Sequence, residues 1–193
     1  MIAGVLLAAG ASRRFGRVKQ LEPWDGEPLL ARAARSFIDA GLDPVVVVVP
    51  ILPAVRASLA GLPLLVVENR EPGRGIGRSI ALGIGALPDA APAALVGVAD
   101  QPFVDAEVIR RLCAAFIPGR IVTPRYGAHG GNPRIFDRRF FPELVALGGD
   151  VGGDVGGQSV AAAHPDAVLE CDFAVRIGLD VDRPEDLERL RGC

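Results

Sequence analysis

Several cations follow an apolar run near the start of the chain, in residues 6–19, which read LLAAGASRRFGRVK. The apolar run predicts a buried strand, and the small residues 8–10 predict a turn whose backbone lies close to a flat base. Backbone amides of such a turn can hold phosphates, and Arg14 and Lys19 can neutralise a triphosphate and a pyrophosphate leaving group. Lys19 is also the single lysine of the chain. The segment therefore predicts a nucleotide site.

The spacing within this segment differs from two common phosphate-binding patterns. A P-loop needs a hydroxyl residue directly after its lysine, but Gln20 follows Lys19 here. A Rossmann dinucleotide fingerprint needs Gly-x-Gly-x-x-Gly, which residues 6–19 lack. The segment indicates a different nucleotide chemistry.

Asp100 comes directly after the apolar segment 94–99, which predicts a second buried strand. A carboxylate at the end of a buried strand is costly unless something compensates its charge. Mg²⁺ is one such compensation because hard cations take carboxylate oxygens. We expect Asp100 to lie near the opening loop and to bind magnesium, since ligands gather at the carboxyl ends of parallel strands.

Short β-branched runs alternate with helical patterns along the whole chain, which predicts an α/β fold with a doubly wound, mainly parallel sheet. Strands are expected at 2–8, 45–49, 63–67, 94–99, 120–123 and 167–175, and helices at 28–40, 53–60, 76–87, 106–116, 137–147, 158–163 and 184–191. A Gly-rich loop is expected at 148–157. The length of 193 residues predicts a single domain spanning 1–193.

The net charge of −2 and the pI of about 5.7 give no electrostatic case for nucleic acid as the main partner. Prolines interrupt the apolar segments too often for a membrane span, and no cationic region precedes the first one as in a signal peptide. The three cysteines lie far apart without metal-ligand spacing. We expect free thiols and a cytoplasmic protein.

The pattern LAAGxSxRxGxxK in residues 7–19 resembles the signature of the MobA-like nucleotidyltransferases. The resemblance continues through the Asp-x-Pro motif at Asp100, the segment from Asn69 to Ser79, and the closing motif at 180–186 that reads DVDRPED. It implies a three-layer, Rossmann-like nucleotidyltransferase fold. That superfamily couples a nucleoside triphosphate to a phosphorylated acceptor and releases pyrophosphate.

The resemblance also implies a set of site residues. Lys19, Arg14 and Asp100 take catalytic roles, and Asp100 and Asp180 are the expected ligands of Mg²⁺. Asp182 is either a further ligand or the cap of the last helix. The expected nucleotide-binding residues are Leu7, Ala8, Ala9, Gly10, Ser12, Arg14, Lys19, Gly75 and Ser79.

Residues 130–136, which read GGNPRIF, and the loop 153–158 are similar to one branch, the molybdenum cofactor cytidylyltransferases (MocA-like). Asn132 and Gln158 depart from the branch pattern, and GGDV occurs twice in 148–155. The branch implies transfer of CMP from CTP to the phosphate of molybdopterin, with a molybdoenzyme or its chaperone as recipient. The expected acceptor-binding residues are Gln101, Pro102, Gly131, Asn132, Pro133 and Asp154.

Three alternatives to this hypothesis stay open. GTP is the first alternative donor, although the guanylyltransferase branch resembles Leu-Ala-Gly-Gly where this chain has Ala9. Another phosphorylated acceptor is the second. A non-catalytic chaperone that binds a nucleotide or cofactor is the third, and the presence of both Lys19 and Asp100 argues against it.

Overall fold

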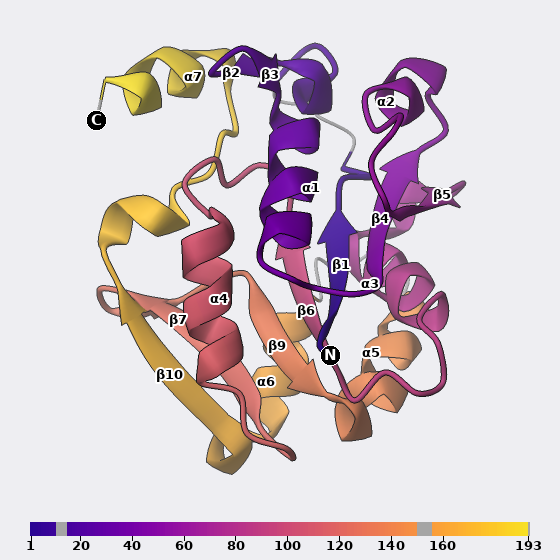
Figure 1. Cartoon of the computed structure of the whole chain (residues 1–193), viewed down its shortest axis with the longest axis vertical. Helices are drawn as coiled ribbons and strands as arrows, with labels where there is room; N and C mark the ends of the chain where they lie inside the picture. Colours follow the sequence, from indigo (N-terminus) through magenta and orange to yellow (C-terminus); the bar gives the residue numbers. More distant parts are fainter. Residues whose placement is uncertain (11–14, 150–155, 193) are drawn as a thin grey trace.

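A mostly parallel sheet runs through the middle of the molecule, with helices on both faces (Figure 1). This computed structural model describes residues 1–10, 15–149 and 156–192. The sheet order is β10-β7-β9-β6-β1-β4-β5. These strands are β1 (Ala3–Leu7), β4 (Val45–Pro50), β5 (Leu65–Asn69), β6 (Ala93–Val98), β7 (Ile121–Tyr126), β9 (Arg134–Asp137) and β10 (Val168–Phe173), and the short β8 (His129–Gly130) pairs with β7.

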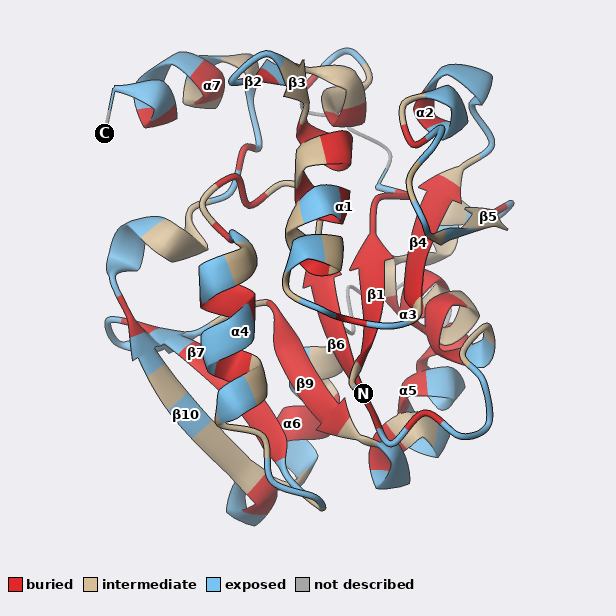
Figure 2. Cartoon of the chain, viewed as in Figure 1, coloured by how far each residue is buried: buried red, intermediate tan, exposed pale blue. Residues whose placement is uncertain are grey.

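Helices cover both faces of this sheet, so the predicted doubly wound, three-layer α/β fold is confirmed. One face packs against α1 (Leu29–Asp39), α2 (Pro53–Ala57) and α4 (Ala106–Ala114), and the other against α3 (Ile76–Gly85), α5 (Phe141–Ala146) and α6 (Gly157–Ala163). The valines of β4 alternate between the two cores, with Val47 on one side and Val48 on the other. Figure 2 shows the central strands buried along most of their length.

The strand β9 runs antiparallel to both of its neighbours, β6 and β7. The sequence pattern predicts only a helix from residue 137, and that prediction is wrong at its start. The chain forms β9, then a 3-10 turn at Arg138–Phe140, and only then α5. Ile135 and Phe136 are buried on opposite faces of the sheet, so tertiary packing between β6 and β7 decides the conformation of this short run.

A small third core holds the last helix, α7 (Pro184–Arg191), against a hairpin formed by β2 (Pro23–Trp24) and β3 (Glu27–Pro28). The hairpin turns through Asp25 and Gly26, both with positive φ. Its strands have two residues each, too few for a periodic signal in the sequence. Val181 is completely buried in this core, which fixes the chain just before α7.

The start of α7 corrects one of the two expectations for Asp182. Arg183 is the cap residue, and the carboxylate of Asp186 accepts the backbone N–H groups of Asp182 and Arg183 at 3.0 and 2.9 Å. Asp182 is therefore not the cap of this helix.

The switch in strand order falls beside β1, because β4 lies on one side of it and β6 on the other. Leu7 and Val98, the last residues of β1 and β6, are paired in register. The loops that follow them therefore begin side by side at the carboxyl edge of the sheet, where doubly wound folds bind ligands. This register brings residues 8–10 and Asp100 together, as predicted.

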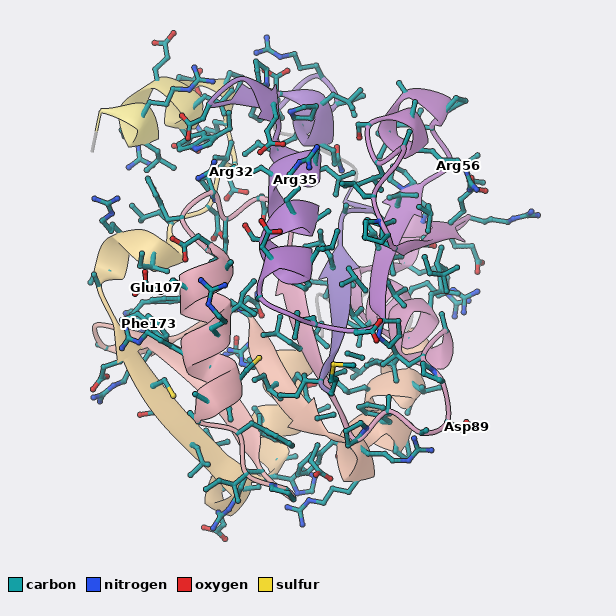
Figure 3. The ribbon with its side chains drawn as sticks, viewed as in Figure 1. Arg32, Arg35, Arg56, Asp89, Glu107 and Phe173 are labelled. Atoms are coloured by element: carbon teal, nitrogen blue, oxygen red, sulfur yellow. The ribbon has the colours of Figure 1, made fainter. Side chains whose placement is uncertain are left out.

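Charged side chains extend from the outer surface (Figure 3), and several of them form ion pairs. Arg35 on α1 lies 3.1 Å from Glu27, and Arg56 on α2 lies 3.4 Å from Glu68. Such exposed pairs contribute little to stability. In the described ranges, every helix is too short or too polar to cross a bilayer.

Candidate functional site

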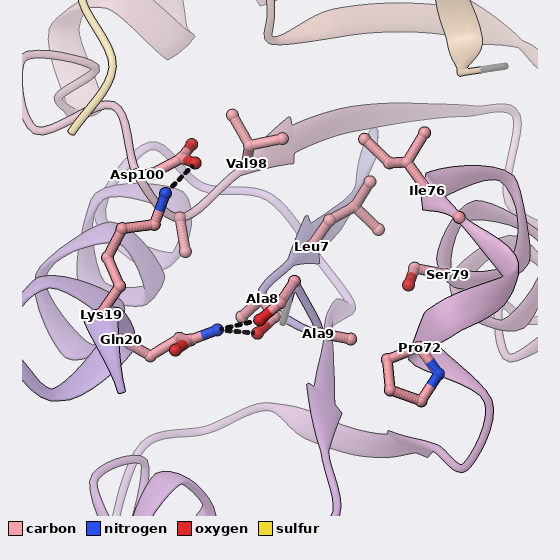
Figure 4. Close-up of a pocket in the computed structure, with 13 residues that line it drawn as sticks. Leu7, Ala8, Ala9, Lys19, Gln20, Pro72, Ile76, Ser79, Val98 and Asp100 are labelled. Carbon is pink, nitrogen blue, oxygen red and sulfur yellow. Dashed lines mark hydrogen bonds and ion pairs between the residues drawn. The ribbon is translucent and has the colours of Figure 1, made fainter. Parts of the chain in front are cut away.

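A cavity of about 280 Å³ opens at the carboxyl edge of the sheet, between the loops after β1 and β6 and the start of α3 (Figure 4). Apolar residues form much of its wall, and a few polar groups converge on it, as in pre-formed small-molecule sites. Its lining consists of Leu7, Ala8, Ala9, Gly10, Lys19, Gln20, Pro72, Gly75, Ile76, Ser79, Val98, Ala99 and Asp100. The cavity brings together the predicted loop, lysine, serine and aspartate.

Gln20 holds the loop after β1 in place, a role that the sequence pattern did not predict. Its buried amide Nε2 donates to the backbone carbonyl of Ala8 at 2.6 Å and of Gly10 at 3.0 Å (Figure 4). These two bonds turn the carbonyl oxygens toward Gln20. In the sequence, Gln20 is visible only as an amide residue directly after Lys19. An exposed glutamine at this position would look the same.

We expect Gln20→Glu to lower the free energy of unfolding by about 2–4 kcal/mol, because a carboxylate cannot donate to the two carbonyls and would be buried beside them. Chemical denaturation measures this change. The matched control is Gln158→Glu at an exposed position, which should change the unfolding free energy by less than about 0.5 kcal/mol. Equal stability of the two variants would show that Gln20 does not anchor the loop.

Lys19 and Asp100 form an ion pair at the mouth of the cavity, although 81 residues separate them in the sequence. Lys19 Nζ lies 2.7 Å from Asp100 Oδ2, and their side chains are 15% and 27% exposed. Lys19 stands on the 3-10 turn η1 (Lys19–Leu21), next to the anchoring Gln20. The lysine therefore reaches the cavity from one side while the carboxylate reaches it from the end of β6.

The segment before α7 adds two carboxylates to this pair. The backbone N–H of Val181 donates to the carbonyl of Asp100 at 2.9 Å, which docks the segment beside the end of β6. Asp182 Oδ1 then lies 3.8 Å from Lys19 Nζ. Asp180 is an exposed residue whose carboxyl group lies near Asp100, Lys19 and Gln101. Partial burial and the negative charge of Asp100 raise the pKa of Asp180 to about 6.

We expect this pKa to give the metal-free protein a stability that falls as the pH rises through about 6. The folded state binds the proton of Asp180 more tightly than the unfolded chain, whose carboxyl has its ordinary pKa of 3.8. The stabilisation is complete below that value and is lost above about 6. Asp180→Asn cannot titrate, so its stability relative to wild type should increase as the pH rises from about 3.8 to about 6, the interval between the two pKa values, and should stay constant above it.

Urea unfolding at several pH values measures this difference, with Asp89→Asn at an exposed loop position as the control. Asp89 carries the same charge outside the site and should show no such trend. A stability difference between Asp180→Asn and wild type that stays constant across this range would contradict the shifted pKa.

Ser79 faces the cavity from the opposite wall, at the start of α3 (Figure 4). Its buried Oγ accepts a hydrogen bond from Asn69 Nδ2 at 3.0 Å, and Asn69 Oδ1 accepts the backbone N–H of Glu71 at 2.8 Å. Because Asn69 already fills an acceptor position of Ser79, the hydroxyl proton can point to a ligand. Gly75 precedes the helix with φ of 97°, a conformation that favours glycine.

Two arginines near Ser79, Arg74 and Arg78, both pair with Glu71, at 3.6 and 3.2 Å. Neither lines the cavity described above. Their charges are therefore partly compensated by protein before any ligand arrives.

The residues predicted to bind an acceptor are divided between two places. Asn132 lines a second cavity of about 240 Å³, which continues from the first along α3 and shares Leu7, Ile76 and Val98 with it. Gly131 and Pro133 flank Asn132 in the sequence but line neither cavity. Gln101 and Pro102, which follow Asp100, are buried and also line neither cavity. Gln101 donates to the carbonyl of Gly178 at 3.4 Å, so it packs against the segment that carries Asp180.

Three predicted residues, Ser12, Arg14 and Asp154, lie outside the described residues. The structure therefore places Leu7, Ala8, Ala9, Gly10, Lys19, Gly75, Ser79 and Asp100 around one cavity, and Asn132 in the adjoining one. Within 1–10, 15–149 and 156–192, no three His, Cys, Asp or Glu side chains gather closely enough to form a metal site by themselves.

A family model described as the MobA-like NTP transferase domain matches residues 4–168. The chain belongs to this family. The match includes β1, the opening loop, α3 and Asp100, and thus every described residue that lines the first cavity. The resemblance inferred from the sequence motifs is therefore confirmed, and the chain is a MobA-like nucleotidyltransferase by family and fold.

Named relatives of this MobA-like chain differ in their activities. It is 32% identical over 161 residues to a nicotine blue oxidoreductase of Paenarthrobacter nicotinovorans, covering 78% of each chain. It is 37% identical over 123 residues to a molybdenum cofactor guanylyltransferase of Rhodobacter capsulatus, covering 59% of this chain and 58% of that protein. The family is thus clear, but these relatives do not share one reaction.

Solved structures show the same fold over the full length of the chain. Rv0371c from Mycobacterium tuberculosis H37Rv superposes with a TM-score of 0.84 at 30% identity, covering 100% of this chain and 99% of that one. A complex of Rv0371c with manganese has a TM-score of 0.77 at 28% identity, covering 98% and 97%.

Proposed function

We propose that this chain transfers CMP from CTP to the terminal phosphate of molybdenum-bound molybdopterin and releases pyrophosphate. The observation that carries the proposal is the Lys19–Asp100 pair, at 2.7 Å, on the rim of a cavity walled by residues 7–10 and Ser79. A cation and an anion at one edge of a base-sized cavity are what phosphoryl transfer requires for charge neutralisation and positioning.

In this reaction an oxygen of the acceptor phosphate attacks the α-phosphorus of CTP, a new P–O–P bond forms, and the bond to the β-phosphate bridging oxygen breaks. The electron pair and negative charge leave with pyrophosphate. Lys19 Nζ, which is held by Asp100 in the free protein, donates to a phosphate oxygen on which charge develops. Arg14 is proposed as the second cation. Ser79 donates its hydroxyl proton to the base or ribose, with Asn69 fixing the orientation of Oγ.

The carboxylates fit a divalent cation that is shared with the nucleotide. Asp100 and Asp180 lie close enough for the charge of one to raise the pKa of the other, and this repulsion is relieved by a cation. Mg²⁺ is typically held by one or two carboxylates completed by substrate phosphates, which agrees with fewer than three acidic ligands in the described site. Bound there, Mg²⁺ would supply neutralisation of the phosphate charge. The manganese complex of Rv0371c supports a divalent metal in this fold.

The choice of CTP is proposed from the size of the cavity wall at Ala9. Ala9 lines the cavity and is 3% exposed, so its methyl group occupies space that a glycine would leave to a larger base. The guanylyltransferase of Rhodobacter capsulatus is the observation that keeps GTP as the second donor candidate. We further propose a cytoplasmic protein that passes its product to a molybdoenzyme or its chaperone, in keeping with the free thiols of Cys113 and Cys171.

A panel of CTP, GTP, ATP and UTP with purified molybdopterin, molybdenum-loaded and metal-free, tests the proposal through pyrophosphate release. We expect CTP with the molybdenum-loaded acceptor to give kcat/KM about 10–100-fold above the other nucleotides. A preference for GTP would show that CTP is not the donor, while nucleotidyl transfer would remain the proposed reaction. The absence of pyrophosphate with every pair would overturn the acceptor class, and would make the redox activity named for the Paenarthrobacter relative the next candidate.

A further inference from the structure

Arg134 places a guanidinium group inside the second cavity, beneath the residues proposed to bind the acceptor. It lies on β9 opposite Val96 of β6, and it is 6% exposed. Its Nη1 donates to Asn132 Oδ1 at 3.0 Å, while its Nε has no hydrogen-bond partner. Burial lowers the pKa of this guanidinium, which nevertheless stays charged at neutral pH.

The described surroundings of Arg134 lack a compensating carboxylate. Neither an Asp nor a Glu of the described ranges forms an ion pair with it, although an isolated buried charge is costly. The nearby Tyr126 donates its hydroxyl proton to the backbone carbonyl of Asn132 at 2.7 Å, and its raised pKa keeps it neutral. The other walls are mainly apolar, with Ile80 and Phe136 among them. The described lining of the cavity thus carries one positive charge and one buried donor without a partner, Arg134 Nε.

We propose that Arg134 binds an oxyanion on the part of the acceptor that is remote from the reacting phosphate. A guanidinium matches the oxygen geometry of a phosphate, carboxylate or metal-oxo group, and a neutral ligand would leave its charge buried and uncompensated. The inference rests on the proposed transfer for the identity of the acceptor. The anion site itself rests only on the geometry of Arg134.

The two cavities adjoin, so one acceptor molecule can occupy the second while it reacts in the first. Leu7, Ile76 and Val98 belong to both linings, and Lys19 and Asp100 lie in the first alone. An acceptor whose phosphate reaches Lys19 therefore extends along Val98 toward Arg134, between α3 and β9. Its flat or apolar middle would contact Ile76 and Phe136, and its second oxyanion would meet the guanidinium.

Thermal unfolding of the free protein tests the anion site without any catalysis. The probes are molybdate and inorganic phosphate, each compared with chloride at equal ionic strength. We expect both to raise the unfolding midpoint of wild type and of the exposed control Arg70→Met, which removes the same charge elsewhere. Arg134→Met should lose most of this response. In chloride it should unfold roughly 2–8 °C above wild type, because an uncompensated buried charge has been replaced by an apolar side chain of similar length.

Two further variants make these results decisive. Lys19→Met removes a cation of the first cavity and should keep the response to the probes, which separates the two cavities. Arg134→Lys keeps a charge and should keep a weaker response. A response of Arg134→Met equal to wild type, no response in wild type, or a midpoint in chloride lowered by Arg134→Met would each overturn the site, the last by showing a structural role for the arginine.

The transfer assay shows whether the oxyanion that Arg134 binds belongs to the acceptor or to the nucleotide. Arg134→Met should lower kcat/KM for the acceptor by about 10–100-fold and change the KM for CTP by less than about twofold, since the lost charge-assisted hydrogen bonds contact the acceptor alone. A raised KM for CTP with an unchanged acceptor KM would assign the site to the nucleotide and overturn the proposal. If wild type transfers nothing, the proposed function fails, while the thermal measurements still decide whether Arg134 binds an anion.

Discussion

Lys19→Met is expected to lower kcat/KM for nucleotidyl transfer by about 10²–10³-fold, the usual effect of removing one donor that stabilises charge developing in a transition state. The 2.7 Å contact with Asp100 shows that Nζ lies at the cavity edge before a nucleotide arrives. The same change should alter the free energy of unfolding by only about 1 kcal/mol, because the ion pair is partly open to solvent. Steady-state kinetics and urea denaturation measure the two effects on one preparation.

Two further variants test whether this effect is specific to Lys19. Arg35→Met removes a cation from the outer face of α1, where Arg35 pairs with Glu27, and should leave transfer unchanged within about twofold (Figure 3). Lys19→Arg keeps the charge but substitutes a planar fork for a compact ammonium, so it should recover only part of the activity. If Lys19→Met retained wild-type kcat/KM, the lysine would be a structural partner of Asp100 only.

Asp100→Asn is expected to lower kcat by about 10³-fold, because the variant keeps the shape of the side chain but removes the charge that is proposed to hold the divalent cation. It should also abolish the increase in thermal unfolding midpoint that Mg²⁺ or Mn²⁺ produces together with CTP. The free protein is expected to remain folded, since Lys19 then faces a neutral amide and can pair with Asp182, which already lies 3.8 Å from its Nζ.

The control for Asp100→Asn is Asp89→Asn on the exposed loop before β6, which makes the same chemical change far from the cavity (Figure 3). It should leave both kcat and the response to metal intact. Full turnover by Asp100→Asn would show that this carboxylate neither binds the metal nor positions Lys19. Loss of turnover with an unchanged metal response would assign the metal to other residues and restrict Asp100 to holding Lys19.

Much of the first cavity could be predicted from the sequence because its residues follow strands with strong local signals. The apolar run before Ala8 and the one before Asp100 each predict a buried strand, and the carboxyl ends of neighbouring parallel strands meet at one edge. The motif around Lys19 was specific enough to identify the family. At the start of α4 the carboxylate of Asp105 accepts two backbone N–H groups, a role that this residue type favours.

The second cavity could not be predicted in the same way, because its chemistry depends on packing between distant segments. In the sequence Arg134 is one of twenty arginines, most of which would be placed at the surface. It is buried only because β9 inserts between β6 and β7, and this strand also takes Asp137, the first residue of the predicted helix. No local periodicity distinguishes such a residue from an exposed one.

The sequence by itself determined the fold class, the family, and several residues of the first cavity, because strand periodicity and a short loop motif are local properties of the chain. Only the tertiary structure decided which carboxylates meet. Burial of Val181 beneath α7 brings Asp180 and Asp182 to Lys19 and Asp100, and Gln20 anchors the loop at Ala8. These contacts join residues far apart in the sequence, so their formation depends on the packing of the whole fold.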